Sequence, residues 1–201
     1  MRTGVFGGTF DPVHVGHVAM AEAAAMKFGL SHVLFVPARL SPHKVEPPSD
    51  ARHRVAMLAL ALSGRPDWSI AFDDLDREGP SFTVDTLRAL SARSLQSELW
   101  LLMGTDTLAG LARWKEPAEI VRLARVAAFY RDPFRGHGLV VPEVDGLSDR
   151  LEVFDAGSVR ISSTELRKKL SSGQPAAGQV PPAVAEYITK QGLYSAGVIE
   201  R

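Results

Sequence analysis

The chain has 201 residues, which favours one domain over two, because domains contain about 150 residues. Its 23 basic and 23 acidic side chains cancel, so its overall charge does not favour binding to nucleic acid or to an anionic membrane. The absence of cysteine excludes thiol nucleophiles, disulfides and zinc–thiolate sites. The longest apolar stretch, Val55–Leu62, is too short to span a membrane, and no apolar secretion signal begins the chain. We therefore expect a cytoplasmic protein.

Short apolar segments alternate with longer segments of helical period. The predicted strands are Thr3–Phe6, His32–Val36, Ser69–Phe72, Leu99–Met103, Val126–Tyr130 and Leu151–Phe154. The predicted helices are Val15–Phe28, Ala51–Leu62, Thr83–Leu90, one that begins at Pro117, one that runs from the Ser162/Glu165 capping box to Gly173, and Ala183–Gln191. The connecting segments Arg131–Gly146 and Gly173–Pro182 are predicted loops.

Strands that alternate with helices form a mainly parallel sheet with helices on both faces. The predicted fold is therefore α/β, Rossmann-like and doubly wound. We expect a single domain over residues 1–201, with the last helix and tail, residues 182–201, packed onto it.

Polar residues follow most of the predicted strands. Because ligands bind beyond the carboxyl ends of strands in open parallel sheets, these residues are expected to meet at one edge of the sheet. They are Gly7–His17, His43 and Lys44, Arg77–Thr83, Gly104–Asp106, Arg131, and Ser162–Arg167.

The segment Gly7–His17 carries the densest chemical signal. Its paired glycines allow close approach of the backbone to a ligand, and His14 and His17 share one face at a helix start. Together they predict a phosphate site, although its spacing fits neither a P-loop nor a dinucleotide fingerprint. The alternatives are a glycine turn with two structural histidines, or a zinc site, which lacks a third ligand at the usual spacing.

Further residues have two interpretations each. Lys44 either closes over a polyphosphate or is a solvated lysine beside His43. Arg167, with Ser162 and Ser163 at the same helix start, either completes an anion site or belongs to an ordinary capped helix. Trp114 either stacks on a heterocycle or is buried in the core, and Asp106 either accepts hydrogen bonds from a ribose or caps a short helix.

Taken together, these segments resemble the nicotinate-mononucleotide adenylyltransferase family of nucleotidyltransferases. The stretch Gly7–His17 is similar to the superfamily's HxGH signature with its preceding GGTFDP, and Ile161–Arg167 to its ISSTxxR motif. Arg77–Leu87, Gly104–Asp106 with Trp114, and Val180–Tyr194 narrow the resemblance, which covers nearly the whole chain. Ser41 and Phe82 depart from the family pattern, where a second proline and a tyrosine are more usual.

The resemblance implies transfer of AMP from ATP to the 5′-phosphate of nicotinate mononucleotide in NAD biosynthesis, with release of pyrophosphate. It implies that His14, His17, Lys44 and Arg167 are the catalytic residues, the histidines at the triphosphate and the other two at the departing pyrophosphate. Mg²⁺ is expected to bind with ATP rather than to dedicated protein ligands. The implied ATP-binding residues are Gly7, Gly8, Thr9, Phe10, Gly104, Asp106, Ile161, Ser162 and Ser163, and the implied substrate-binding residues are Ser81, Thr83 and Trp114.

The expected partners are ATP and nicotinate mononucleotide, without nucleic acid or membrane, and a homo-oligomer is compatible with the sequence. The alternatives are a nucleotidyltransferase of the same fold that uses nicotinamide mononucleotide or pantetheine phosphate, or a non-catalytic nucleotide-binding module. A fragment of a class I aminoacyl-tRNA synthetase is a further alternative, against which the short neutral chain argues.

Overall fold

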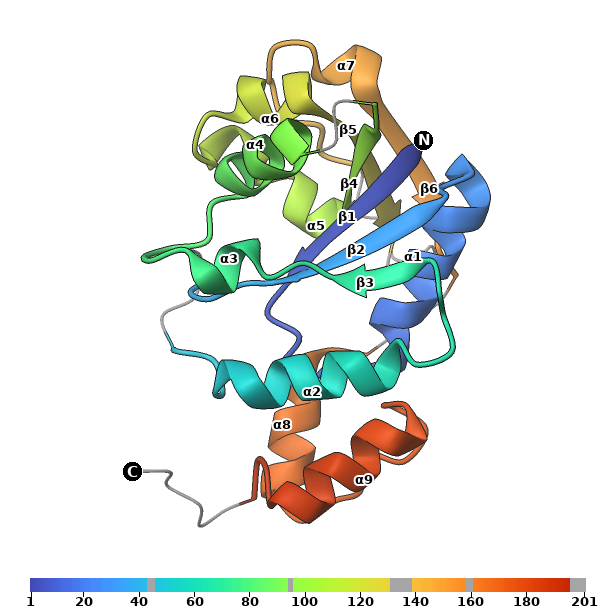
Figure 1. Cartoon of the computed structure of the whole chain (residues 1–201), viewed down its shortest axis with the longest axis vertical. Coiled ribbons are helices and arrows are strands. Elements are labelled where there is room, and N and C mark those ends of the chain that lie inside the picture. Colours follow the sequence, from blue (N-terminus) through green and yellow to red (C-terminus); the bar gives the residue numbers. More distant parts are fainter. Residues whose placement is uncertain (43–45, 94–95, 131–138, 158–160, 196–201) are drawn as a thin grey trace.

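The computed structural model describes residues 1–42, 46–93, 96–130, 139–157 and 161–195. Within them, six strands form one parallel sheet in the order β3-β2-β1-β4-β5-β6 (Figure 1). The strands are β1 (Arg2–Gly8), β2 (His32–Pro37), β3 (Trp68–Ile70), β4 (Glu98–Gly104), β5 (Ala124–Tyr130) and β6 (Leu151–Asp155). The longer helices are α1 (Val15–Phe28), α2 (Ala51–Ala61), α4 (Thr83–Arg93), α6 (Pro117–Leu123), α8 (Ser163–Ser171) and α9 (Pro182–Gln191).

The strand order places a topological switch point between β1 and β4. The chain passes from β1 outward through β2 to β3 and then returns to pair β4 with the other side of β1. Thr3 of β1 is in register with His32 on one side and with Leu99 on the other. In open parallel sheets, ligands bind beyond the carboxyl ends of the strands at this point.

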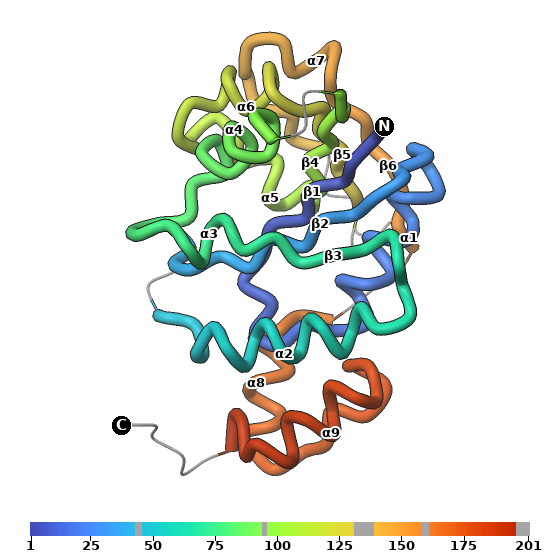
Figure 2. Tube along the Cα trace, in the orientation of Figure 1, coloured from blue at the N-terminus to red at the C-terminus, as the bar shows by residue number. Residues whose placement is uncertain are grey.

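Alternation along the strands produces a core on each face of the sheet. In β4, Trp100 and Leu102 point toward α1, α2 and α9, whereas Leu101 and Met103 point toward α4, α5 (Thr105–Leu108) and α6. Figures 1 and 2 show these two sets of helices on opposite sides of the sheet. The doubly wound α/β prediction is confirmed, and α9 packs against α2.

The helix boundaries follow from their caps. Helix α1 begins after the N-cap His14 and ends at Gly29, whose φ of 60° is in the left-handed region that glycine tolerates. Asp50 accepts a hydrogen bond from the Arg52 amide at the start of α2, and Ser162 accepts one from the Glu165 amide at the start of α8. The predicted range of α1 is confirmed.

Some predicted boundaries are wrong. Strand β3 ends at Ile70 rather than Phe72, because Phe72 is the N-cap of a short helix and is 46% exposed. Helix α4 continues to Arg93 rather than ending at Leu90, and Leu62 is the C-cap of α2. The sequence also did not predict the short helices α3 (Asp73–Asp76), η1 (Leu111–Arg113) and α7 (Leu147–Arg150), and the short helix considered beside Asp106 is α5, which begins at Thr105.

No helix in the described ranges is both long and apolar enough to cross a lipid bilayer.

Candidate active site

A cavity of about 850 Å³ lies beyond the carboxyl ends of β1 and β4. Its lining comes from the segments that follow β1, β2, β3, β4 and β6, so the predicted meeting of these segments is confirmed for the described residues. His43, Lys44 and Arg131 lie outside the described residues. The predicted site residues in the lining are Gly7, Gly8, Thr9, Phe10, His14, His17, Ser81, Thr83, Gly104, Asp106, Trp114, Ser162 and Ser163.

His14 and His17 form a reciprocal cap at the start of α1. The His17 amide donates to His14 Nδ1 over 3.3 Å, and the His14 amide donates to His17 Nδ1 over 3.2 Å. The two rings are stacked with their centroids 3.6 Å apart. The three-residue spacing thus places both imidazoles at the cavity, as the sequence predicts.

This cap determines which ring nitrogen carries the proton. A ring nitrogen that accepts a hydrogen bond is unprotonated, so in the neutral form of each ring the proton resides on Nε2. Both residues line the cavity, where an Nε2–H group is a hydrogen-bond donor suited to an oxyanion.

The Phe10 ring packs against His17 of this histidine pair. The φ of 51° at Phe10 turns the chain after β1, and its ring is 1% exposed. The ring packs edge-on against His17 with centroids 5.0 Å apart and contacts Phe6 and Phe35 at 5.8 and 5.6 Å. A Cβ atom at Gly8 would lie 2.9 Å from Phe10 Cζ, so glycine is required there by the close approach of the ring.

The start of α8 is bound to the loop between β1 and α1. Ser163 Oγ donates to the Pro12 carbonyl over 2.9 Å, and Arg167 Nη1 donates to the Asp11 carbonyl over 2.7 Å. Arg167 is therefore not a purely solvated residue, although it does not line the cavity itself. Ile161, predicted in the ATP site, packs against the apolar core and does not contribute to the cavity lining.

Three of the longer helices begin at the cavity. The lining includes His14 at the start of α1, Thr83 at the start of α4, and Ser162 at the start of α8. Unpaired backbone amides and the helix dipole make each such end electropositive. The cavity is therefore suited to a ligand with several negative charges.

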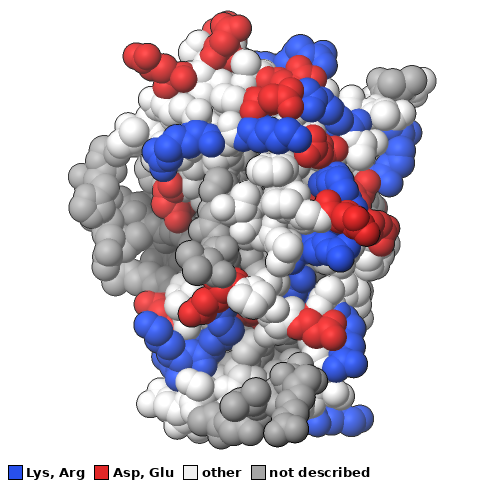
Figure 3. All heavy atoms as spheres, turned by 90° about the vertical axis from the view of Figure 1, so that its left-hand side faces the viewer, with Lys and Arg blue, Asp and Glu red and all other residues white. Residues whose placement is uncertain are grey.

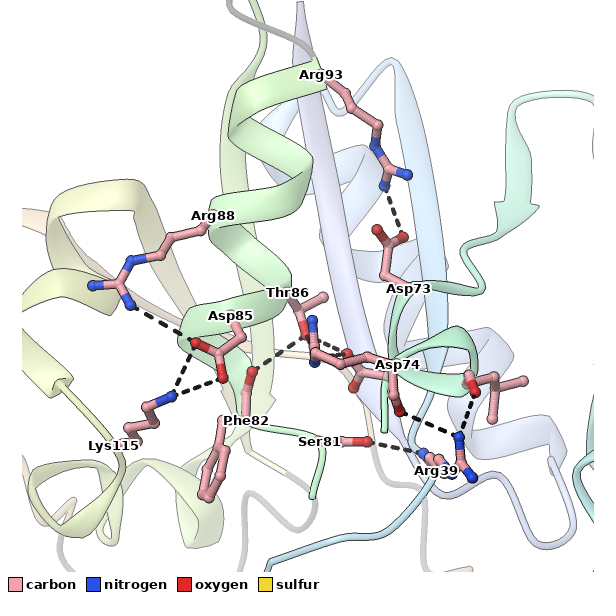
Figure 4. Close-up of polar contacts among 12 residues, drawn as sticks. Arg39, Asp73, Asp74, Ser81, Phe82, Asp85, Thr86, Arg88, Arg93 and Lys115 are labelled. Carbon is pink, nitrogen blue, oxygen red and sulfur yellow. Dashed lines mark hydrogen bonds and ion pairs between the residues drawn. The ribbon is translucent and has the colours of Figure 1, made fainter. Parts of the chain in front are cut away.

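A buried carboxylate organises the wall beside Thr83 (Figure 4). Asp74 on α3 accepts hydrogen bonds from Thr86 Oγ1 and, over 2.6 Å, from Arg77 Nη2. Burial raises the pKa of Asp74, and the hydrogen bonds from Thr86 and Arg77 oppose that rise. Ser81 Oγ accepts the Arg39 amide over 2.9 Å, which fixes the loop that precedes Thr83.

Ion pairs hold the segment around Trp114. Lys115 Nζ lies 2.9 Å from the Asp85 carboxylate and 5.0 Å from the centre of the Phe82 ring (Figure 4). Arg88 contacts Asp85 and forms a bidentate pair with Glu116, whose φ of 50° marks the turn before α6. On the face in Figure 3, acidic and basic side chains are interspersed.

The structure narrows the alternative roles that the sequence left open for Trp114 and Asp106. Trp114 is half-buried and lines the cavity, so it is not simply a core residue. Gly104 is the N-cap of α5, which places Asp106 inside the first turn and exposed at the cavity, rather than at the capping position.

Sequence reasoning missed the residues that hold the histidine loop. Arg54 is 1% exposed and donates to the carbonyls of Thr9, Ala38 and Ser49. Tyr194 donates to Asp11 Oδ1 over 2.6 Å. No local pattern marks the Arg54–Thr9 and Tyr194–Asp11 contacts, because they join residues 45 and 183 positions apart.

Fold and cavity together define the class of this protein, a Rossmann-like nucleotidyltransferase whose cavity is lined by hydrogen-bond donors and helix N-termini suited to phosphate groups. The chain belongs to the cytidylyltransferase-like family, whose model matches residues 5–169, and within it to the nicotinate-nucleotide adenylyltransferases.

Curated relatives are similar in sequence to this chain over nearly its full length. A probable nicotinate-nucleotide adenylyltransferase of Thermomicrobium roseum is 39% identical over 195 residues, which cover 96% of this chain and 91% of that one. A relative of the same name from Tropheryma whipplei is 40% identical and covers 94% and 97%. The nicotinic acid mononucleotide adenylyltransferase of Plasmodium falciparum, solved in complex with NaAD, has the same fold, with a TM-score of 0.75, 19% identity and coverage of 96% and 97%.

Proposed function

We propose that this protein transfers the adenylyl group of ATP to the 5′-phosphate of nicotinate mononucleotide, forming the deamido dinucleotide and pyrophosphate in NAD biosynthesis. The observation that carries this proposal is the convergence of two imidazoles and the N-termini of three longer helices on one cavity. Relatives that are 38–40% identical over nearly the whole chain support it.

The reaction needs alignment more than it needs a strong base. The acceptor phosphate is already ionised at neutral pH and attacks the α-phosphorus of ATP, and the bond to the pyrophosphate oxygen breaks. His14 and His17 would donate their Nε2–H groups to phosphate oxygens as charge shifts toward the leaving group. Their Nδ1 caps hold both rings in place before the substrate binds.

Arg167 and the start of α8 would stabilise the departing pyrophosphate. The bond from Arg167 to the Asp11 carbonyl holds the guanidinium beside the histidine loop, and a guanidinium has further N–H donors for phosphate oxygens. The amide of Ser163 at the helix start would add to this stabilisation. Lys44, assigned to the same task from the sequence, lies outside the described residues.

The two organic groups would occupy opposite walls of the cavity. Gly8 and Gly104 allow close approach of adenosine, and Asp106 would accept hydrogen bonds from its ribose. Trp114 would stack on the pyridine ring. Thr83, at the electropositive start of α4, would donate to the ring carboxylate.

Mg²⁺ would reach the site with ATP. Within the described ranges, no cluster of three or more histidine or acidic side chains is arranged to hold a metal ion. When bound to the phosphates, Mg²⁺ would neutralise part of their charge. The proposed unit is a single nucleotidyltransferase domain over residues 1–201 that acts in the cytoplasm.

The experiment that tests this function is an acceptor panel. Pyrophosphate release from ATP and Mg²⁺ is measured with nicotinate mononucleotide, with pantetheine phosphate, and without acceptor, and the nucleotide product is identified by mass spectrometry. We expect release with nicotinate mononucleotide and formation of the deamido dinucleotide. Equal or faster release with pantetheine phosphate would assign the chain to another reaction of the same fold.

A pair of histidine variants tests the assigned site. His17→Ala is expected to lower kcat by about 10²–10³-fold, the usual cost of losing a preorganised donor. His32→Ala is the control. His32 is the first residue of β2, contacts Ser69 of β3 and does not line the cavity. Comparable losses in the two variants would show that His17 has only a structural role.

A further inference from the structure

We propose that Tyr194 is a positioning residue for the reaction, which it assists by holding Asp11 and thereby the loop that carries His14 and His17. This inference rests on the proposed function for its kinetic consequence. Tyr194 follows α9, near the C-terminal end of the chain, and does not line the cavity.

Asp11 joins four segments of the chain. Its side chain accepts hydrogen bonds from the Tyr194 hydroxyl over 2.6 Å and from the Ser49 amide over 3.1 Å. Its carbonyl accepts the Arg167 guanidinium over 2.7 Å. With an exposed fraction of 4%, the Asp11 carboxylate has little access to water, so these protein donors determine its position.

Arg54 holds the same loop from α2. Its guanidinium donates to the carbonyls of Thr9 and Ala38 over 2.9 and 2.8 Å, and its positive charge attracts Asp11. Burial lowers the pKa of Arg54, and the neighbouring Asp11 carboxylate opposes that shift. Tyr194 therefore completes a buried polar cluster in which the carboxylate is held from two directions.

The segment after α9 is shaped to deliver the tyrosine. Gly192 ends α9 with a φ of 64°, and the Leu193 amide returns to the Ile188 carbonyl over 3.0 Å. Tyr194 itself has a φ of 64°, a conformation that is uncommon for a residue with a side chain. Such a conformation persists where surrounding contacts impose it, and here the contacts include the hydrogen bond to Asp11 and packing against the apolar core.

The chemistry of the pair suits a permanent contact. Burial and the adjacent Asp11 carboxylate raise the pKa of Tyr194, so its hydroxyl stays protonated and donates throughout the physiological pH range. Asp11 lies three residues before His14, and the intervening Val13 is fully buried. A shift of Asp11 is therefore transmitted to the backbone amide of His14, which caps His17.

This path predicts a change in kcat more than in KM. The imidazoles would act on charge that develops in the transition state, whereas adenosine and the pyridine ring are held by other walls of the cavity. Displacement of a catalytic group by about 1 Å costs up to about 10²-fold in rate. For the loss of one hydroxyl we expect kcat to fall about 10-fold, with the two KM values within about 3-fold of the native ones.

The test compares two hydroxyl deletions near the C-terminal helix. Tyr194→Phe removes the bond to Asp11, and Tyr187→Phe removes the contact of Tyr187 with His53 Nδ1, 2.9 Å long, between α9 and α2. We expect both variants to lower Tm, but only Tyr194→Phe to lower kcat. In an Asp11→Ala background, Tyr194→Phe should cause no further loss of kcat, because the bond is already absent.

A second measurement does not depend on turnover. The ¹⁵N resonances of the His14 and His17 rings report hydrogen bonding at Nδ1, and we expect them to shift in Tyr194→Phe and to stay unchanged in Tyr187→Phe. If the native enzyme released no pyrophosphate but these resonances shifted selectively, the positioning would stand and the proposed function would fail. Unchanged histidine resonances in Tyr194→Phe, a kcat within 2-fold of native, or an equal loss in Tyr187→Phe would each overturn the inference.

Discussion

Gly7 and Gly8 at the end of β1 allow two effects to be measured separately. Replacement of Gly8 disturbs protein packing, whereas replacement of Gly7 changes only the space open to ligand. A Cβ atom at Gly8 would lie 2.9, 3.1 and 3.2 Å from three atoms of the Phe10 ring. Phe10 cannot yield easily, because its ring is packed among Phe6, Phe35 and His17. Overpacking of this kind costs about 1–3 kcal/mol, so Gly8→Ala should lower Tm by roughly 2–12 °C in a chain of this length.

The same displacement should affect catalysis. The Phe10 ring contacts His17 edge-on, so a shift of Phe10 moves the imidazole. We expect kcat to fall by about 10-fold or more, since small misplacement of a catalytic group is costly.

Gly7→Ala is the matched control. A Cβ atom at Gly7 meets no protein atom within 4 Å, and Gly7 lines the cavity. Its Tm should stay within about 1 °C, as for a substitution that neither strains nor packs against the protein, while the KM for ATP rises because the added methyl occupies ligand space. Thermal unfolding and steady-state kinetics of both variants check this. A Gly8→Ala protein with native Tm and native kcat would refute the reasoning from the Phe10 contact.

Three further predictions follow from buried or cavity-lining groups. Arg54→Met removes the donor to three carbonyls and the cation beside Asp11, so it should lower the free energy of unfolding by about 3–5 kcal/mol. The control Arg52→Met, at an exposed arginine, should lower it by less than about 1 kcal/mol. Urea unfolding measures both values, and equal losses would contradict the burial argument. The raised pKa of Asp74 means that its stabilising contribution is lost as pH rises, so the unfolding free energy of the native protein relative to Asp74→Asn should decrease above about pH 4. A pH-independent difference would show that this pKa is not raised. Trp114→Ala should raise the KM for the mononucleotide by about 10-fold through lost stacking, with a smaller change for ATP; the reverse order would place the indole at adenosine.

Sequence patterns predicted the parts of the fold that depend on local chemistry. Helix α1 was predicted to the residue from its helical composition and the stop at Gly29, and the structure adds the reciprocal His14/His17 cap at its start. Helices α3 and α7 were missed, because a four-residue helix has no hydrophobic period to detect. The position of Phe72 was wrong because an apolar residue next to a strand can equally precede a helix turn and remain exposed.

The site divides in the same way. The lining residues follow strands, so the topology rule places them at the cavity from the sequence alone. The supporting residues Arg54, Asp11 and Tyr194 come from three separate segments, and only the folded chain brings the carboxylate between the guanidinium and the phenol. The sequence shows Arg54 only as an arginine within a predicted helix, and such a residue is ordinarily at the surface. Its burial is visible only in the structure.

The most direct test of the proposed reaction is the ratio of kcat/KM for nicotinate mononucleotide to that for nicotinamide mononucleotide, measured with ATP and Mg²⁺. The two acceptors differ only in a ring carboxylate or amide, so the ratio reports whether donors such as Thr83 and the start of α4 face that group. Each mismatched donor costs about 1–3 kcal/mol, and two or three together predict a preference for the acid of at least about 10²-fold. A ratio near one would contradict the placement of Thr83 and Trp114 at the ring, and a preference for the amide would contradict the assignment of nicotinate mononucleotide as the acceptor.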